Sequence, residues 1–358
     1  MLSPSNADLA ARWSRLRGEQ PTLRIRDAAT TLGVSEAELV ALCIGNEGVG
    51  TTATPLAADW RSILSEMPSV GRVMCLTRNE HCVHERHGRF EDVQVTGPNG
   101  LVLGPDIDLR LFLGSWKHGF AVREPLKLGN QQGERLSLQV FDGAGEAVHK
   151  IYATEETDRP AFDALIARHR AAAPAELAVT PRAADTTDRP DSEIDIEGLR
   201  QAWRAMKDTH EFFGMLGKFK VGRVQALRLV GEEFARELPS RALRSAMEAA
   251  SAGGTPIMIF VGSGGCIQIH SGPINRLVEV HGWFNVLDPA FNLHLREAGV
   301  ARVFSVRKPT DDGVVTSIEA FCNRDRNILL MFGARKPGKP ELEPWRNIVA
   351  RIEKQAAS

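Results

Sequence analysis

His210 is the residue of this chain whose type and neighbours point most directly to chemistry. It lies near an expected helix terminus, two residues after Asp208, and the aromatic pair Phe212 and Phe213 follows it closely. A neutral imidazole beside flat apolar side chains is what axial ligation of a haem iron requires. A partly buried histidine that packs between two helices would show the same pattern, so residue types alone leave both interpretations open.

The chain contains two copies of one sequence pattern. Residues 107–113 and 120–125 recur as residues 291–297 and 304–309, both at one common spacing. Further matches at nearly the same spacing extend the repeat over nearly the whole chain: 34–42 with 221–229, and 136–141 with 316–321. Apolar positions recur because both copies need the same core. A polar position that differs therefore marks a role that one copy has acquired by itself.

Several of the differing polar positions carry a cation or an imidazole in one copy only. Such an asymmetric set of charges in a duplicated fold predicts one site built between two lobes, and that site should favour an anionic ligand. The pairs of corresponding residues are Arg110 and His294, Glu124 and Lys308, and Leu23 and His210.

Helical spacing and short strands alternate in the same order in both copies. Consecutive strands joined by tight turns imply antiparallel pairing, and helices at the ends of each copy make the fold class α+β. We therefore expect an internal duplication in which each copy has N-terminal helices, an antiparallel sheet and a C-terminal helix. Helices are expected at 8–20, 35–43, 60–67, 161–169, 196–210, 211–219, 221–236, 240–252 and 341–354, with strands between 73 and 152 and between 257 and 332.

The domain organisation follows from the repeat and from one stretch of unusual composition. Residues 171–196 are rich in Ala, Pro, Asp and Thr and poor in apolar residues, which is typical of an exposed linker. The first structural repeat is then residues 1–170. The second is residues 197–358, and it carries His210.

Composition excludes several classes of function. The net charge is −1, so no overall basic field favours nucleic acid, and no apolar run approaches the length of a membrane span. The first residues lack the basic and apolar regions of a signal peptide. Five cysteines, an odd number without CxxC spacing, are expected to be buried free thiols in a reducing compartment. We expect a soluble cytoplasmic protein.

Other catalytic motifs are weak. No Ser-His-Asp arrangement and no pair of catalytic carboxylates stands out in the sequence. His81, His84 and His87 are evenly spaced, but no set of cysteines or carboxylates completes a zinc shell around them. We interpret these three as surface histidines.

An ordered series of sequence words resembles the HmuS/ChuS-type family of haemin-degrading and haemin-transport proteins. The series includes Asp-Leu-Arg-Leu-Phe-Leu at 108–113, Asp-Thr-His-Glu-Phe-Phe at 208–213 and Gly-Trp-Phe-Asn at 282–285. It runs from about residue 9 to about residue 350 and includes the duplication. No single word is specific, whereas the ordered series is.

The resemblance implies that the ligand is haem b, iron protoporphyrin IX. It implies that His210 ligates the iron and that Arg110 lies on the distal side as the catalytic residue. Arg223, Lys308 and Arg335 are similarly associated with the haem and its propionates. The physical chemistry agrees, because two carboxylates need fixed cations and Arg offers a bidentate geometry.

Phe332 is a departure from the family pattern. Members of the family have a tyrosine here, before Gly-x-Arg and near the haem, whereas the single tyrosine of this chain is its repeat counterpart Tyr152. Phe332 can pack on a porphyrin face, but it cannot ligate iron or donate a hydrogen bond. A second protein ligand from this position is therefore excluded.

The implied function is that of a cytoplasmic haem-binding protein of bacterial haem-iron utilisation. Such a protein accepts imported haemin and degrades it to release iron, with electrons from an external reductant or partner. The alternative is a non-catalytic chaperone that delivers intact haem to a separate haem oxygenase, with the same residues. Expected partners are a haem importer, an oxygenase or an electron donor, and both a monomer and a dimer stay open. A structural protein without a ligand would leave the asymmetric cations unexplained.

Overall fold

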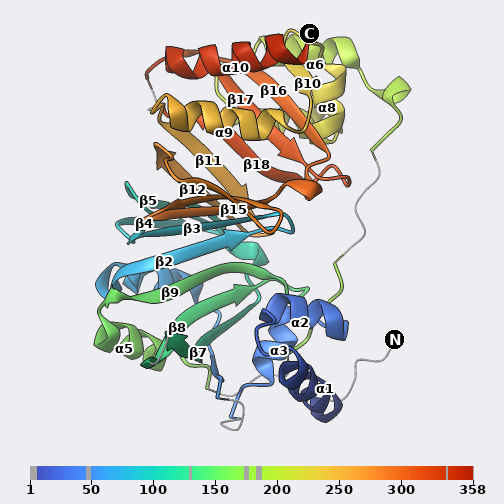
Figure 1. The fold of residues 1–358 in the computed structure, drawn as a ribbon. Coiled ribbons are helices and arrows are strands. Elements are labelled where there is room, and N and C mark those ends of the chain that lie inside the picture. The colour runs from blue at the N-terminus through green and yellow to red at the C-terminus, as the bar shows by residue number, and fades with distance from the viewer. Residues whose placement is uncertain are drawn as a thin grey trace. The chain divides into compact units, whose positions relative to one another are not determined.

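Alternating buried and half-buried side chains define the strands of this fold, as in β2 (Gly71–Arg78) and β11 (Ile257–Gly262). This alternation places successive side chains on opposite faces of a sheet. The structure is a computed structural model that describes residues 6–45, 50–128, 131–172, 177–182, 188–335 and 338–357. Two units are distinguished by packing (Figure 1): unit 1 is residues 1–78, 85–183 and 263–268, and unit 2 is residues 79–84, 184–262 and 269–358.

Unit 1 is built on an antiparallel sheet with the strand order β1-β7-β8-β9-β2. Its strands are β1 (Thr52–Pro55), β7 (His118–Leu128), β8 (Gln131–Phe141) and β9 (Ala147–Thr157), besides β2. Its helices are α1 (Asn6–Glu19), α2 (Ile25–Leu32), α3 (Glu36–Ala41), α4 (Trp60–Glu66) and α5 (Arg159–His169). The strands β4 (Asp92–Thr96), β5 (Asn99–Leu103) and β6 (Asp108–Phe112) form an antiparallel meander. Part of β3 (Cys82–Arg89) also belongs to this unit.

Unit 2 has the corresponding sheet, in the strand order β10-β16-β17-β18-β11. Its strands are β10 (Ala235–Leu238), β16 (Arg302–Thr310), β17 (Gly313–Phe321) and β18 (Asn327–Gly333), besides β11. Its helices are α6 (Ile196–Arg204), α7 (Glu211–Phe219), α8 (Arg223–Leu229), α9 (Ala242–Ala252) and α10 (Glu343–Ala356). A second meander consists of β13 (Leu277–Val280), β14 (Trp283–Asp288) and β15 (Phe291–Arg296), and part of β12 (Cys266–Gly272) completes the unit.

The two units share their strand registers as well as their order. Phe120 is opposite Gln139 in unit 1, and Phe304 is opposite Glu319 in unit 2. These are the residues that the sequence repeat pairs with one another, Phe120 with Phe304 and Gln139 with Glu319. The predicted α+β class and the internal duplication are therefore confirmed. The exact limits of the linker stay a prediction.

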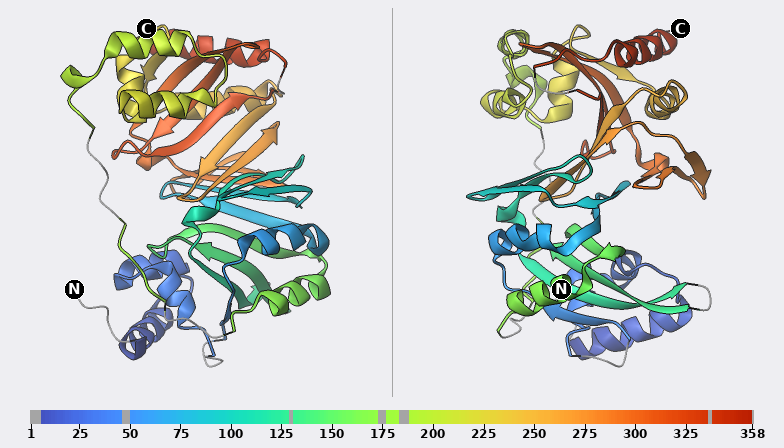
Figure 2. Two further views of the ribbon diagram at one scale, coloured as in Figure 1. Left: turned by 180° about the vertical axis from the view of Figure 1, so that it is seen from behind. Right: turned by 90° about the vertical axis from the view of Figure 1, so that its left-hand side faces the viewer.

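Helices cover both faces of the unit 2 sheet (Figure 2). One face packs against α6, α7 and α8 through Phe304, Val306 and Phe321. The other packs against α9 and α10, and Val303 and Ile318 belong to that second core. Because side chains alternate along each strand, neighbouring residues serve separate cores. The same alternation separates the two candidate sites described below.

Some sequence predictions need correction. The helix expected at 221–236 ends at Leu229, because Gly231 has a φ of 96° that interrupts the helix before β10. The helix expected at 196–210 ends at Arg204, and the short helix α2 was missed. His84 is fully buried and its ring lies 4.9 Å from that of Phe291, so it is no surface histidine.

Two expectations from composition can be compared with the structure. All five cysteines are free and buried, as predicted. No helix within the described ranges combines the length and the apolar content that a membrane span would need.

Candidate functional site

His210 occupies the N-cap position of α7, and its side chain is 92% exposed. Asp208 fixes the ring, because its Oδ1 lies 2.6 Å from His210 Nδ1 and also accepts the backbone N–H of His210 at 2.8 Å. These hydrogen bonds hold the pKa of Asp208 below its usual value. An ionised carboxylate only accepts hydrogen bonds, so Nδ1 carries the proton and Nε2 keeps its lone pair. His210 is thereby prepared as a metal ligand through Nε2.

The two aromatic residues that follow His210 have different surroundings. Phe212 is buried and its ring lies 5.2 Å from that of Trp203, edge to face. Phe213 is 66% exposed, and its ring lies 5.9 Å from that of Phe212. Phe212 therefore anchors α7 in the core of unit 2, while Phe213 offers an apolar surface next to His210.

A buried ion cluster lies beneath this aromatic pair. Glu319 of β17 accepts hydrogen bonds from Arg223 Nε and from Lys308 Nζ, each at 2.8 Å. Burial alone would favour the neutral acid, but the two cations hold the pKa of Glu319 well below its usual range. Burial lowers the pKa of Lys308, and Arg223 adds to this effect, whereas Glu319 opposes it. We call these three residues the Glu319 cluster; with both cations charged it carries one excess positive charge.

The Glu319 cluster contacts the aromatic residues of α7 directly. Arg223 Cζ lies 4.9 Å from the ring centre of Phe212 and 5.7 Å from that of Phe213. Lys308 Nζ lies 4.4 Å from the ring centre of Phe212. Cations over aromatic faces are favourable interactions. The structure thus brings two predicted cationic residues together beside the helix that His210 begins.

Glu319 is a residue that the sequence interpretation missed. Arg223 and Lys308 were expected as cations available to a ligand, whereas both already bind a buried carboxylate. A signal was present in the sequence, because Glu319 takes the place of the neutral Gln139 in the other copy. The same comparison that selected Lys308 would have selected Glu319.

Arg335 lies on the side of Asp208. Its Nη2 is 3.3 Å from Asp312 Oδ2, and its charge contributes to the lowered pKa of Asp208. The β16–β17 turn approaches the same loop, since the backbone N–H of Asp311 donates to the carbonyl of Lys207 at 2.9 Å. The charge of a further predicted cation therefore acts on Asp208, the residue that binds His210.

Phe332 lies on the sheet face that carries Glu319. It is opposite Ser317 of β17 and Met258 of β11, and its ring lies 5.1 Å from that of Phe260. Four half-buried apolar residues share this face, and we call them the unit 2 apolar patch: Met258, Phe260, Leu330 and Phe332. Unit 2 thus has both an apolar surface and charged groups, the two features that a flat apolar ligand with charged edges would need.

Arg110 lies in unit 1, on β6. Its Nη1 forms an ion pair with Asp108, two residues earlier on the same strand face, and also donates to the carbonyl of Leu109 at 3.3 Å. Burial raises the pKa of Asp108 although Arg110 opposes this. The guanidinium remains partly exposed. Its distal role stays a prediction.

The donor set in unit 2 suits iron that already has other ligands. Within the described residues no group of three or more His, Cys, Asp or Glu side chains could hold a bare metal ion. A single imidazole suffices for haem, because the porphyrin supplies the equatorial ligands of the iron. His210 would suit the iron of such a molecule. The unit 2 apolar patch would suit its ring, and the nearby cations would suit its carboxylates.

Comparisons with known proteins identify the family of the chain. The model of the haemin-degrading HemS.ChuX domain matches residues 33–169 and again residues 220–352. The hemin transport protein HmuS of Yersinia pestis is 39% identical over 352 residues, which is 97% of this chain and 98% of that protein.

Solved structures are similar over almost the whole chain. Holo-PhuS, a heme-binding protein from Pseudomonas aeruginosa, has a TM-score of 0.92 and 47% identity, over 98% of this chain and 99% of that one. ChuS, an E. coli heme oxygenase, has a TM-score of 0.85 and 36% identity, over 96% of this chain and 99% of that one. The resemblance inferred from the sequence words is confirmed. The chain belongs to the family defined by the haemin-degrading HemS.ChuX domain.

Proposed function

We propose that this chain binds haem through His210 and handles it in bacterial iron acquisition. The observation that carries the proposal is the pair of His210 and Asp208. The imidazole is exposed, its tautomer is fixed by a carboxylate, and the exposed Phe213 follows it three residues later at the start of α7. Few structural roles need a histidine in this state, whereas ligation of iron does.

The other predicted residues take roles that match the parts of a haem molecule. Phe332 and its neighbours in the unit 2 apolar patch would contact the porphyrin ring. Arg335 and the Glu319 cluster would provide positive charge for the propionates. Arg110 would serve as a hydrogen-bond donor on the distal side, where donors aimed at developing negative charge favour reaction.

Degradation of haem with release of iron is the activity we propose first. It is supported by family membership and by ChuS, which is a heme oxygenase. Electrons would come from an external reductant or a partner protein. The buried free cysteines suit a reducing compartment, so we place this function in the cytoplasm.

Delivery of intact haem is the second candidate. It is supported by the exposure of His210, since a single exposed ligand suits reversible transfer, and by HmuS, which is a hemin transport protein. Both candidates need the same binding residues. They differ in the fate of the porphyrin ring.

A haemin titration of the apoprotein, followed by Soret absorbance, tests the binding step. Wild type should show a saturable one-to-one transition, and His210→Ala should weaken it at least ~100-fold, because removal of the ligand should cost no less than loss of an outer-shell partner. His281→Asn is the matched control, since His281 is exposed and Asn tolerates its φ of 50°. Absence of a saturable transition in wild type would refute the haem proposal.

The fate of haem separates the two candidates. With a reductant, degradation predicts loss of the Soret band together with free iron, and Arg110→Ala should slow this loss. Delivery predicts quantitative transfer to an apoprotein acceptor without ring breakdown. If Arg110→Ala leaves both affinity and turnover unchanged, the distal role of Arg110 is wrong.

A further inference from the structure

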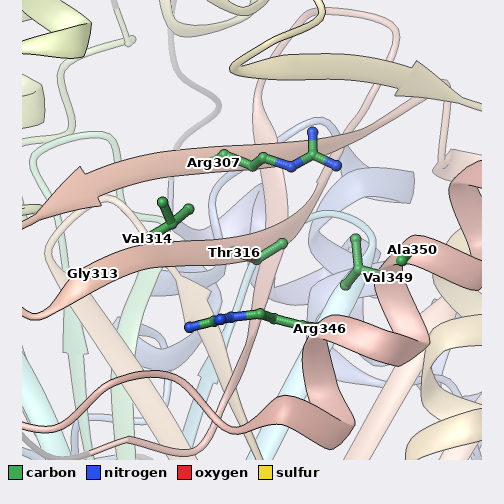
Figure 3. Close-up of a pocket in the computed structure, with 7 residues that line it drawn as sticks. All are labelled: Arg307, Gly313, Val314, Thr316, Arg346, Val349 and Ala350. Carbon is green, nitrogen blue, oxygen red and sulfur yellow. The ribbon is translucent and has the colours of Figure 1, made fainter.

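Unit 2 contains a cavity of about 470 Å³ between the β16–β17 hairpin and helix α10. Figure 3 shows Arg307 and Arg346 on two sides of it, with small apolar side chains between them. The lining includes Val314, Thr316, Val349 and Ala350. We call this cavity the α10 pocket.

The α10 pocket lies on the other sheet face from the Glu319 cluster. Arg307 and Thr316 are opposite each other in the β16–β17 ladder, and each directly neighbours a residue of the opposite face, Lys308 and Ser317. Side chains of neighbouring strand residues point to opposite faces. The pocket is therefore separate from the proposed haem-binding surface, and the inference drawn from it does not rest on haem binding.

The corresponding arginine of unit 1 is held by two ion pairs. Arg123, the counterpart of Arg307, contacts Glu134 Oε1 at 2.7 Å and Asp163 Oδ1 at 2.5 Å. The equivalence follows from the registers, since Arg123 is opposite Leu136 in the way that Arg307 is opposite Thr316. Two carboxylates thus bind the guanidinium of Arg123 in unit 1.

Unit 2 has lost both of these carboxylates. Val314 stands at the position of Glu134 by the strand register. Arg346 stands at the position of Asp163, as the buried positions of the two helices show. Those positions are Phe162, Leu165 and Ile166 in α5 and Trp345, Ile348 and Val349 in α10. One acid has become an apolar residue and the other a cation.

In unit 2 each arginine of the pocket pairs with one carboxylate, whereas Arg123 of unit 1 pairs with two. Arg307 forms an ion pair with Glu353, which Ser305 Oγ also contacts at 2.5 Å. Arg346 Nε lies 3.5 Å from Glu341, and the Arg346 side chain is 48% exposed. Burial raises the pKa of Glu341, although the backbone of Thr316 and the charge of Arg346 oppose this shift. Val314 is 41% exposed and lines the pocket together with the two arginines.

We propose that the α10 pocket binds an amphipathic organic carboxylate, with its apolar body on Val314 and Val349 and its carboxylate on Arg346, the more exposed of the two arginines. Guanidinium groups bind carboxylates by charge-assisted hydrogen bonds, and an apolar cavity floor with few polar groups is typical of small-molecule sites. The substitution of two acids relative to unit 1 is what a site for such an anion requires.

Isothermal titration calorimetry of the full chain tests the proposal, with decanoate and 1-naphthylacetate as probes and in the presence and absence of haemin. We expect saturable binding of one probe molecule per chain in both states. The double variant V314E/R346D rebuilds the acids of unit 1, and it should weaken binding at least ~10-fold through loss of a charge-assisted contact. Haemin binding by this variant should stay unchanged.

The mirror variant E134V/D163R guards against misfolding as an explanation. It removes the two acids that pair with Arg123 in unit 1, and it should add a second binding site for the same probe. Absence of saturable binding of either probe to wild type would overturn the proposal. So would unchanged binding in V314E/R346D.

Discussion

Both units bury one glutamate together with two cations, but the charges are distributed differently between helix and sheet. In unit 1 the glutamate is Glu36, the first residue of α3, which contacts Lys150 Nζ at 2.5 Å and also binds Arg78. Its counterpart in the sequence repeat is Arg223, the first residue of α8. The same helical position thus carries opposite charges.

In unit 2 the sheet supplies the carboxylate instead. Glu319 stands where unit 1 has Gln139, and it binds the helix residue Arg223 together with Lys308. Each of these two clusters therefore contains one negative and two positive groups, and each satisfies its buried charges by pairing. The two clusters differ in the charge that the helix contributes: a carboxylate from α3 in unit 1 and a guanidinium from α8 in unit 2. The Cζ of that guanidinium lies 5.7 Å from the ring centre of the exposed Phe213.

Removal of either buried glutamate should have the largest effect. Glu36→Ala and Glu319→Ala should each lower the free energy of unfolding by ~3–5 kcal/mol, because two cations stay buried without their partner. Urea unfolding at neutral pH measures this loss. Haemin affinity should change in Glu319→Ala and stay the same in Glu36→Ala. Equal effects on haemin affinity would show that the charge distribution of unit 2 has no bearing on binding.

Acid sensitivity gives a second comparison of the two clusters. The pKa of Glu36 is lowered by Lys150 and Arg78, which together outweigh burial, and the pKa of Glu319 is lowered by its own two cations in the same way. A lowered pKa in the folded state adds stability above the unfolded value of ~4.3, and this stability is lost as the pH falls towards the folded pKa.

The corresponding amide variants should therefore unfold with a weaker pH dependence. Glu36→Gln and Glu319→Gln should each reduce the slope of unfolding free energy against pH below pH ~4.3, by up to ~1.4 kcal/mol per pH unit. Urea unfolding at several pH values between ~5 and ~3 provides the measurement. A slope equal to that of wild type in either variant would contradict the assignment for that unit.

Asp208 should matter for binding and little for folding. Asp208→Asn removes the carboxylate that fixes the His210 tautomer, so haemin affinity should fall ~10-fold, within the range for outer-shell partners of metal ligands. Unfolding should be nearly unchanged, because Asp208 is exposed. Glu248→Gln, an exposed change on α9, is the control for loss of one negative charge. An affinity equal to wild type would mean that ring orientation does not limit ligation.

The exchange of the two corresponding aromatic residues should have the smallest effect. Phe332→Tyr restores the tyrosine that the resemblance assigns to this position, and Tyr152→Phe removes its counterpart in unit 1, where Arg135 lies 5.4 Å from the ring centre. Each should change haemin affinity by less than ~1 kcal/mol, since the ring and its apolar area remain. A new charge-transfer absorption band in Phe332→Tyr would instead indicate ligation by oxygen.

The sequence repeat predicted the fold well, because turn-separated strands and recurring apolar positions directly reflect antiparallel pairing. Local sequence propensity did not predict elements whose structure depends on tertiary packing. The N-cap residue of helix α2, Arg24, makes no side-chain cap hydrogen bond. Strand β10 follows a helical sequence pattern that Gly231 interrupts. Short elements of this kind are stabilised mainly by the surfaces on which they pack.

The candidate site was predicted less completely than the fold. The Asp208–His210 contact follows from residues two apart, and a sequence window can suggest it. Glu319 was missed because an acid between Ser317 and Phe321 in a strand also fits a solvent-exposed position of an alternating pattern. Its burial depends on a helix that begins far earlier in the chain, and so does its pairing with Arg223.

The burial of all five cysteines has a practical consequence for experiments on motion. Burial raises the pKa of Cys43 to about 11 and that of Cys266 to about 12, so their reactive thiolate forms are scarce at neutral pH. A cysteine introduced at exposed Glu91 in unit 1 and another at exposed Glu248 in unit 2 should therefore react selectively with maleimide dyes. Energy transfer between the two dyes would then report whether the distance between the two labelled residues changes when haemin is added, without removal of any native thiol.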